Sequence, residues 1–356
     1  MRSTISSLRA SALLLGATLV ALLLLIVALS FYYPGLASAQ TTGTTIQVNT
    51  IADESNTDGD CSLREAIEAA NTNTAVDGCA AGSDTEQDAI LFAVGDKATI
   101  ILGSQLVITD DAGLLIDGQT AKTTLSGNNL VRVFQVDSGA KLTLNNLTVA
   151  NGNAATPGSP GIGGGILNVG TLTVSNSTFS GNIAGLGGGI YNQPSGTLTV
   201  SNSTISGNSA NFVGGIYNQG TLTVNNSTIS SNTAFIEIGG IYGAPVSTTT
   251  LKNTIVAKNF PSGEDCSGII TDGGYNLDSG TSCGFTTQNN SRSSANPRLG
   301  PLADNGGPTD THALRKRSKA INAGGAPFPP TDQRGVQRPQ GKRSDIGAFE
   351  KGVRRR

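Results

Sequence analysis

The stretch LTVSNSTFSGN at residues 172–182 decides the fold, because the chain repeats it with few changes. It returns as LTVSNSTISGN at 198–208 and as LTVNNSTISSN at 222–232, with looser copies at 142–146 and 249–253. Glycine runs that end in isoleucine separate the copies, at 163–166, 187–190, 214–216 and 239–241. The distance between copies varies while the strand-like core does not, which is typical of a solenoid of stacked units.

Each unit contains short alternating runs of Leu, Val, Ile and Thr, separated by Gly, Asn and Ser. This period of two predicts strands, and no unit contains a helical stripe. Short strands joined by turns predict an all-β chain that forms a parallel β-helix, with coils about 4.8 Å apart. We expect Leu172, Leu198 and Leu222 to form one inward row, and Thr171 and Thr173 to face outward.

The repeated asparagines have two interpretations. Each of them begins an Asn-X-Ser/Thr sequence, the acceptor pattern for N-glycosylation, and the residues are Asn146, Asn176, Asn202 and Asn226. They also occupy the same place in every unit, where stacked amides can hydrogen-bond along the stack. We expect such a ladder. The glycine runs suit a positive φ or a close backbone approach.

Composition indicates a folded protein whose charge is unevenly placed. Only 13% of the 356 residues are charged, and the 47 glycines are concentrated in the repeats. Residues 315–356 hold 12 Lys/Arg against 3 Asp/Glu, although the whole chain has a net charge of −2. This basic end either engages anionic polymers or lipid head groups, or is solvated and pairs with the acidic body, and we expect the second.

Residues 1–39 have the pattern of a signal peptide. Arg2 and Arg9 precede an apolar run at 10–33, and Ala37-Ser38-Ala39 resembles a cleavage site. The run is long enough to span a bilayer, so an uncleaved signal anchor is the alternative and the only membrane contact expected. Either way the sequence predicts an extracellular or cell-surface protein.

Four cysteines form two pairs that are local in sequence, Cys61 with Cys79 and Cys266 with Cys283. Although four cysteines allow three connectivities, export favours disulfides, and local pairing would staple one end region on each side of the repeats. No CxxC spacing occurs and the single histidine, His312, is distant, so these cysteines are not expected to bind metal.

The ends of the solenoid are predicted to differ from its coils. In an N-terminal cap at 45–90, residues 62–71 have helical periodicity, and Ser62 with Glu65 forms a capping-box pattern. This helix would cover the open end of the first coil of a β-helix at 90–290. We expect residues 291–350 to close the other end with irregular strands and loops, followed by a basic tail at 351–356.

The loop before the predicted helix resembles a calcium-binding loop. Glu54, Asn56, Asp58, Gly59 and Glu65 fall at EF-hand positions one, three, five, six and twelve. Glutamate is unusual at the first position, and the preceding residues look like a strand where an EF-hand has a helix. Calcium is therefore a candidate ligand of this loop, and we expect no other metal or cofactor.

Three stretches resemble a group of exported bacterial proteins. CSLREA at 61–66 resembles the motif that names the CSLREA domain, and the repeats resemble those of polymorphic outer-membrane proteins. Residues 331–336, 338–339 and 345–350, supported by 302–308, resemble the choice-of-anchor Q ending. The resemblance spans about residues 45 to 350 and implies a right-handed parallel β-helix of the pectin lyase-like kind. It implies no chemical activity, and the mode of anchoring stays open.

The middle coils lack the groups that polysaccharide cleavage needs. Glycoside hydrolysis normally uses two carboxylates. The charged residues between positions 141 and 259 are Lys141, Glu237, Lys252 and Lys258. Other carboxylates lie on the early coils in contexts typical of Asx-turns, namely Asp110, Asp111 and Asp117. We therefore predict no catalytic residue.

Two regular surfaces remain. Tyr191, Tyr217 and Tyr242 follow inward isoleucines and should stand outward in a row that Leu167 continues, where they dock sugar rings or pack on one another. The Thr-X-Thr series forms a hydroxyl array like that of ice-binding solenoids. We predict a structural or adhesive module, the alternative being a polysaccharide-binding or polysaccharide-cleaving β-helix. Partners would be cell-surface glycans or surface proteins, and no nucleic acid.

Overall fold

The computed structural model describes residues 43–155, 161–261 and 264–352. The predicted signal segment at 1–39 and the end of the basic tail lie outside the described residues. Within those ranges, no helix combines the length and the apolar character that crossing a bilayer requires.

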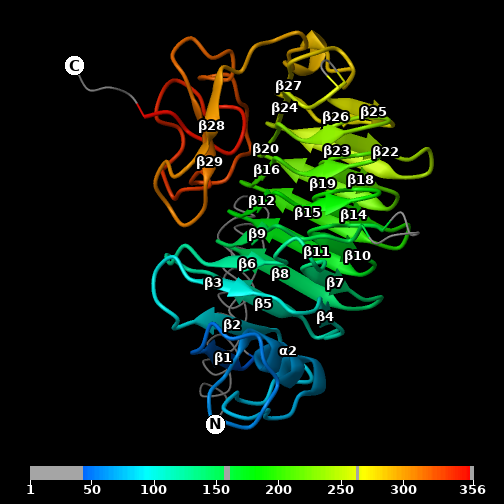
Figure 1. Ribbon diagram of the computed structural model, residues 1–356. Coiled ribbons are helices and arrows are strands. Elements are labelled where there is room, and N and C mark those ends of the chain that lie inside the picture. The colour runs from blue at the N-terminus through cyan, green and yellow to red at the C-terminus, as the bar shows by residue number, and fades with distance from the viewer. Residues whose placement is uncertain (1–42, 156–160, 262–263, 353–356) are drawn as a thin grey trace, which may run out of the picture. The chain divides into compact units, whose positions relative to one another are not determined.

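Parallel sheets stacked along the repeats form the solenoid that the sequence predicts (Figure 1). Sheet 1 has nine strands, sheet 2 seven and sheet 3 eight, and in each of them successive strands come from successive coils. A smaller, three-stranded sheet 4 lies at the turn that follows sheet 3. The predicted parallel β-helix is therefore confirmed.

The strands of sheet 1 are β1 (Thr45–Val48), β2 (Asp88–Phe92), β5 (Leu114–Asp117), β8 (Lys141–Asn145), β11 (Thr171–Ser175), β15 (Thr197–Ser201), β19 (Thr221–Asn225), β23 (Thr248–Lys252) and β26 (Thr271–Asp272). Those of sheet 2 are β4 (Leu106–Ile108), β7 (Phe134–Val136), β10 (Ile166–Asn168), β14 (Ile190–Asn192), β18 (Ile216–Asn218), β22 (Ile241–Gly243) and β25 (Cys266–Gly268). Those of sheet 3 are β3 (Thr99–Ile101), β6 (Thr124–Ser126), β9 (Thr148–Ala150), β12 (Thr178–Ser180), β16 (Thr204–Ser206), β20 (Thr228–Ser230), β24 (Ile255–Ala257) and β27 (Leu277–Asp278).

The remaining elements are the strands of sheet 4, the N-terminal helix and the pieces beyond the coils. They are β13 (Ile183–Ala184), β17 (Ser209–Ala210), β21 (Thr233–Ala234), α2 (Leu63–Thr72), the 3₁₀ turn η1 (Thr287–Asn289), and the antiparallel pair β28 (Leu299–Ala303) and β29 (Thr311–Leu314).

The core is built from aligned rows of aliphatic side chains. Leu172, Leu198 and Leu222 are register partners on β11, β15 and β19, and all three are fully buried, as predicted. Alternation along each strand turns these residues inward and leaves Thr at the outer positions. In the next coil Thr249 takes the position of the leucine.

The N-terminal cap contains the predicted helix. The Ser62 hydroxyl accepts from the Glu65 N–H while the Glu65 carboxylate accepts from the Ser62 N–H, which is the predicted capping box. Helix α2 buries Leu63, Ile67 and Ala70 in the core that the first coils share. Strand β1 precedes the helix in sequence and pairs in parallel with β2, so sheet 1 begins at Thr45.

Both predicted disulfides are present. Cys61 joins Cys79 beside the start of α2, and Cys266 on β25 joins Cys283 in the loop after β27. Each bridge closes a short loop at one end of the repeats, so the two end regions are covalently stapled.

The predicted ladder at the asparagines of the Asn-X-Ser/Thr sequences is wrong. These residues have a left-handed backbone and form turns, with φ between 47° and 54° at Asn146, Asn176, Asn202 and Asn226. Their amides bond in other directions, since Asn176 donates to Asn145 and Asn202 donates to the Thr331 carbonyl. Asn202 and Asn226 are also buried, which disfavours the glycosylation alternative at these two positions.

Other asparagines of the repeat form the ladder. Asn182, Asn208, Asn232 and Asn259 are buried, and the side-chain amide of each donates to the side-chain oxygen of the next at 2.8–3.0 Å. The amide of Asn259 donates to Asp265 at 2.9 Å. Each of the four amides also donates to a backbone carbonyl of an earlier coil. The ladder therefore ties successive coils together inside the turn between sheets 3 and 4.

A second ladder runs beside sheet 2. Asn168 donates to Asn192 and Asn192 to Asn218, both at 2.7 Å, and Asn218 donates to the Thr249 hydroxyl at 2.8 Å. All four side chains are fully buried. The buried threonine in the leucine row is thus the terminal acceptor of this ladder.

The glycine runs serve both expected purposes. Gly187 has φ +63°, which suits glycine. At Gly188 an added Cβ would lie 2.4 Å and 2.6 Å from the carbonyl oxygens of Ser209 and Gly214 on the next coil. Glycine therefore lets neighbouring backbones approach closely at this corner.

Candidate functional site

The tyrosine row forms on the outer face of sheet 2. Leu167, Tyr191, Tyr217 and Tyr242 are register partners on β10, β14, β18 and β22. The ring centroids of Tyr191 and Tyr217 are 5.0 Å apart with an interplanar angle of 13°, and those of Tyr217 and Tyr242 are 4.8 Å apart at 44°. Tyr191 and Tyr217 are therefore stacked, whereas Tyr217 and Tyr242 are in contact at a tilt.

This stacking limits what the row can bind. Tyr191 is only 7% exposed, and its hydroxyl donates to the Gln219 side chain at 2.8 Å. Burial raises the pKa of the Tyr191 and Tyr217 hydroxyls. Because the rings of Tyr191 and Tyr217 lie face to face, a sugar would meet mainly the edges of this pair. The geometry favours the packing interpretation for Tyr191, while Tyr217 and Tyr242 keep partial exposure.

The carboxylates of the early coils form turns. One Asp110 oxygen accepts from the N–H groups of Ala112 and Gly113, and Asp117 accepts from the Gln119 N–H. These are the Asx-turn bonds that the sequence indicated. Burial raises the pKa of Asp110. Asp117 and one oxygen of Asp110 thus have structural partners, whereas the second Asp110 oxygen is buried without a hydrogen-bond partner among the described residues.

The candidate calcium loop gathers acidic groups, although its glutamate ligand is already used. The two Glu65 oxygens accept from the N–H groups of Asn56 and Ser62. Carboxyl oxygens of Glu54, Asp58 and Asp60 lie within 4.8 Å of one another. Burial and the charge of Asp58 raise the pKa of Glu54 and Asp60. Asp77 forms a second such group with Asp60 and Glu65. Calcium at this loop stays a prediction.

The segment after the coils, from residue 291 onward, makes many polar contacts with the coils. The sequence led us to expect it to close the end of the solenoid, but it lies along sheet 3 (Figure 1). Gln333, only 1% exposed, donates to the Thr178 hydroxyl and accepts from the Thr204 hydroxyl at 2.6 Å. Farther along, the Ala348 N–H donates to the Thr228 hydroxyl. The outward threonine row of sheet 3 is therefore covered by the chain itself.

His312 adds a titratable group to this surface. Its Nδ1 donates to the Gly300 carbonyl at 2.8 Å, and in the neutral ring its Nε2 accepts from the Ser206 hydroxyl at 2.8 Å. Burial lowers the pKa of His312. Burial thus favours the neutral ring, whose two nitrogens link the segment to the coils.

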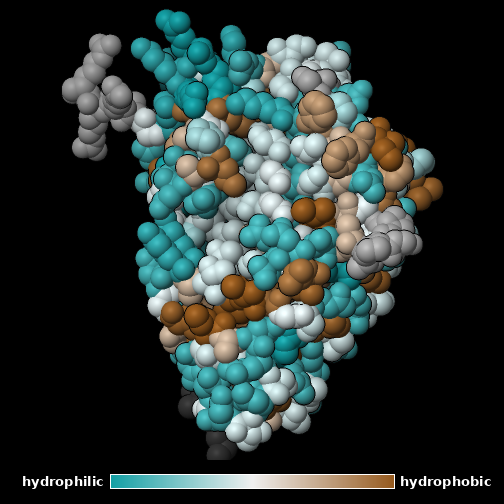
Figure 2. All heavy atoms as spheres, viewed as in Figure 1, coloured by the Kyte–Doolittle hydropathy of each residue, from teal (hydrophilic) through white to brown (hydrophobic). Residues whose placement is uncertain are grey.

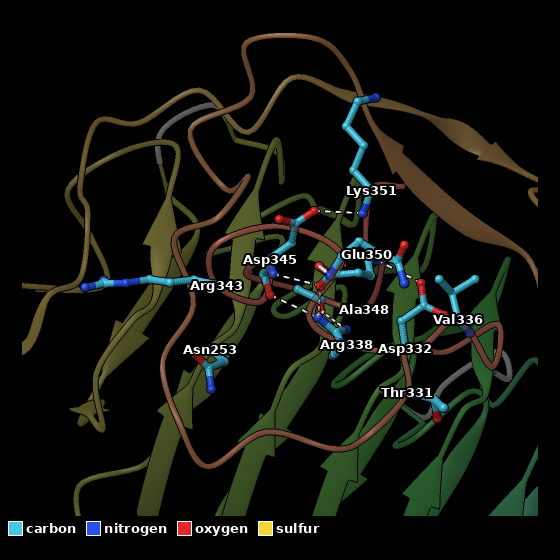
Figure 3. A network of polar contacts seen from close by, with 12 residues as sticks. Asn253, Thr331, Asp332, Val336, Arg338, Arg343, Asp345, Ala348, Glu350 and Lys351 are labelled. Carbon is cyan, nitrogen blue, oxygen red and sulfur yellow. Dashed lines mark hydrogen bonds and ion pairs between the residues drawn. The ribbon is translucent and has the colours of Figure 1, made fainter. Parts of the chain in front are cut away.

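A buried ionic network holds this segment in shape (Figure 3). The Arg338 guanidinium pairs with Glu350 at 3.2 Å and donates to the backbone carbonyls of Asp345 and Gly347. Asp345 accepts from the Lys351 N–H, and burial raises its pKa to about 6. Apart from Lys351, these residues belong to the motifs at 338–339 and 345–350, so the motifs build the docked segment.

Comparison with protein families gives one match. A family model described as a right handed beta helix region matches residues 112–292. Comparisons with curated proteins and with solved structures gave no match. The matched range runs from β5 to β27 and contains both asparagine ladders and the tyrosine row.

Proposed function

The chain belongs to the right-handed β-helix family, and from that premise we propose that it acts outside the cell as a structural or adhesive module without catalytic activity. The fold alone does not decide this, since one fold hosts many functions. The observation that carries the proposal is the uncharged surface of the middle coils.

That surface offers side chains for contact and few for acid–base chemistry. Outer positions of β11, β15 and β19 carry threonine, and sheet 2 carries the tyrosine row. Glu237 is the one carboxylate between residues 141 and 259, and Lys258 donates to the Leu299 carbonyl. Hydrolysis by a carboxylate pair has no candidate in this stretch.

Two further features support an extracellular role. The paired cysteines suit an oxidising compartment, where disulfides persist. Buried amide ladders link coil to coil, which suits a rigid rod that presents the same face repeatedly.

The alternative is a β-helix that binds or cleaves polysaccharide. The partial exposure of Tyr217 and Tyr242 favours binding of neutral glycans over cleavage. The test is a glycan array probed with the secreted chain, together with an assay for new reducing ends on the polysaccharides that it binds.

The variant Tyr217→Leu/Tyr242→Leu removes the rings while keeping apolar packing, because Leu167 occupies the same row in an earlier coil. If the row binds glycans, this variant loses array signal at an unchanged urea midpoint. Thr199→Ser, on the outer face of sheet 1, is the matched surface control. Cleavage of any polysaccharide by the wild-type chain would overturn the non-catalytic proposal.

A further inference from the structure

The charge on the segment after the coils is distributed in an unusual way. Residues 315–352 contain nine Lys/Arg and three Asp/Glu. The three acidic side chains, Asp332, Asp345 and Glu350, are at most 2% exposed. Arg334 pairs with Asp332 at 2.6 Å and Arg338 pairs with Glu350, so two of the three buried acids are neutralised from within. The solvent-exposed charge of this segment is therefore positive.

The exposed basic side chains are Arg315, Lys316, Arg317, Lys319, Lys342 and Arg343. Among the described residues, none of them forms an ion pair with the acidic body. Within the described residues this end is solvated, as expected, but the expected pairing of these cations with the acidic body is not found. Hydrophilic residues gather over this part of the molecule (Figure 2).

Two adjoining hollows open between this segment and the last coils, and Arg343 lines both. One has a volume of about 280 Å³ and is walled by Tyr275, Phe328, Pro339 and Lys342. The other, of about 220 Å³, includes Arg292, Ser291 and Asn290. We call these two hollows the basic cleft. Both hollows are smaller than the usual small-molecule pocket of about 300–1,000 Å³, and each has room for about one sugar ring.

The aromatic wall of the cleft is held firmly. Tyr275 has φ +58°, a conformation that is rare for a bulky residue and is often found at binding sites. Gly325 lies against its ring, so that an added Cβ would be 2.2 Å from a ring carbon. Asn253 fixes Gly325 through two hydrogen bonds, at 2.7 Å and 2.8 Å. Asn253 thus holds Gly325 against the ring of Tyr275.

The cations of the cleft are available. Lys342 and Arg343 are exposed, and neither side chain has a hydrogen-bond or ion-pair partner among the described residues. The nearby carboxylate of Asp272 is occupied within the fold, since one of its oxygens accepts from Ser291 and Asn276. A ligand that brings an anion would therefore find guanidinium and ammonium groups beside aromatic rings.

We propose that the basic cleft binds an anionic saccharide, with a carboxylate or sulfate ester on Arg343 and Lys342 and a sugar face on Tyr275 or Phe328. A guanidinium pairs with either anion in two-point fashion, and rings stack on the apolar face of sugars. The concave shape favours a saccharide over a flat lipid surface. This proposal rests on the proposed adhesive role outside the cell, but its binding residues are separate from the tyrosine row.

The test is titration calorimetry of the full secreted chain with oligogalacturonate, a sulfated oligosaccharide and neutral dextran fragments. The cleft variant is Lys342→Gln/Arg343→Gln, and the control is Arg315→Gln/Lys316→Gln, which removes the same charge from the same segment away from the cleft. Both pairs are exposed, so both variants should fold. A third variant, Phe328→Ala, tests the aromatic wall at constant charge.

The expected result is binding of one anionic sugar class, weakened at least tenfold in the cleft variant and in Phe328→Ala but less than threefold in the control. The two anionic arms distinguish carboxylate from sulfate. Equal losses in both charge variants would indicate diffuse attraction and overturn the proposal. So would tight binding of neutral dextran, or absence of binding to both anionic sugars. None of these outcomes bears on the tyrosine row or on catalysis, so the proposed function is judged separately.

Discussion

Replacing Asn208 with alanine should strongly destabilise the solenoid, because its side chain is a link in the buried ladder. The side chain is fully buried. Its oxygen accepts from the backbone N–H and the side-chain amide of Asn182, at 3.1 Å and 2.8 Å. Its amide donates to Asn232 and to the Phe179 carbonyl.

The cost follows from the groups that are left behind. With alanine at position 208, the backbone N–H of Asn182 and one hydrogen of its side-chain amide have no acceptor. The Asn232 side-chain oxygen still accepts from the backbone N–H of residue 208. A buried donor without a partner costs about 1–3 kcal/mol, so the expected loss in the free energy of unfolding is about 2–6 kcal/mol. That is a large part of the stability of a typical domain.

The measurement is urea unfolding followed by circular dichroism, with amide hydrogen exchange as the local readout. Protection of the Asn182 N–H should fall in Asn208→Ala. The matched control is Asn211→Ala in the same coil, since Asn211 is exposed and its side chain has no hydrogen-bond partner among the described residues. The control should stay within about 0.5 kcal/mol of the wild type.

A second substitution separates the hydrogen bonds from the space they fill. In Asn208→Asp a carboxylate would face the Asn232 oxygen, which now receives an amide N–H at 2.9 Å. The neutral acid can donate to that oxygen and the carboxylate cannot, so this variant should lose stability as the pH rises, whereas Asn208→Ala should not. If Asn208→Ala costs less than about 1 kcal/mol, or no more than the control, the ladder does not hold the coils together.

Three further changes test other parts of the structure. Cys266→Ala/Cys283→Ala opens a loop whose cysteines are 17 residues apart and should lower the free energy of unfolding in urea by about 3 kcal/mol. An equal loss when the wild type is treated with reductant would show that the effect comes from the disulfide. Burial lowers the pKa of His312, so as the pH falls the unfolded chain binds a proton at this residue before the folded chain does. The wild type should therefore lose stability as the pH falls below about 6.5. His312→Gln should lack this contribution. Burial raises the pKa of Asp278 to about 6, so its neutral form stabilises the fold at low pH and that contribution is lost as the pH rises through about 6. Asp278→Asn should therefore unfold at higher urea than the wild type at pH 7.5, and equal midpoints there would contradict the assignment.

The sequence predicted the coils well because their signal is local. Alternation along Leu172 and Val174 fixes which residues face inward, and equal copies fix the register between coils. The capping box at Ser62 is likewise encoded within four residues. Local patterns of this kind survive in the folded chain without knowledge of distant contacts.

The ladder was assigned to the wrong asparagines because both sets recur once in each coil. Asn176 and Asn182 have the same spacing from copy to copy, and spacing alone does not say which one forms a turn and which one points inward. The left-handed backbone of Asn176 decides it, and that depends on the path of the whole coil. The glycine before Asn182 was a usable signal, since it marks the tight corner inside which this asparagine is buried.

The docking of the last segment left no readable pattern in the sequence. Several of its bonds join residues more than a hundred positions apart, as in the contact between Thr204 and Gln333. The coil side of that contact looks like an ordinary exposed threonine row, and a single glutamine carries no periodic signal. The basic cleft could not be foreseen for the same reason, because Tyr275 and Arg343 meet only after the segment has folded back.

The apparent decay of the repeat after residue 248 has a physical purpose. Side-chain amides in both ladders donate toward later coils, so each ladder needs a final acceptor that carries no amide of its own. Thr249 and Asp265 fill these two positions, and the second oxygen of Asp265 accepts from Ser279. An asparagine at either place would carry another N–H₂ group onward and demand one more acceptor. What reads in the sequence as a fading pattern is therefore the chemistry that ends the stack.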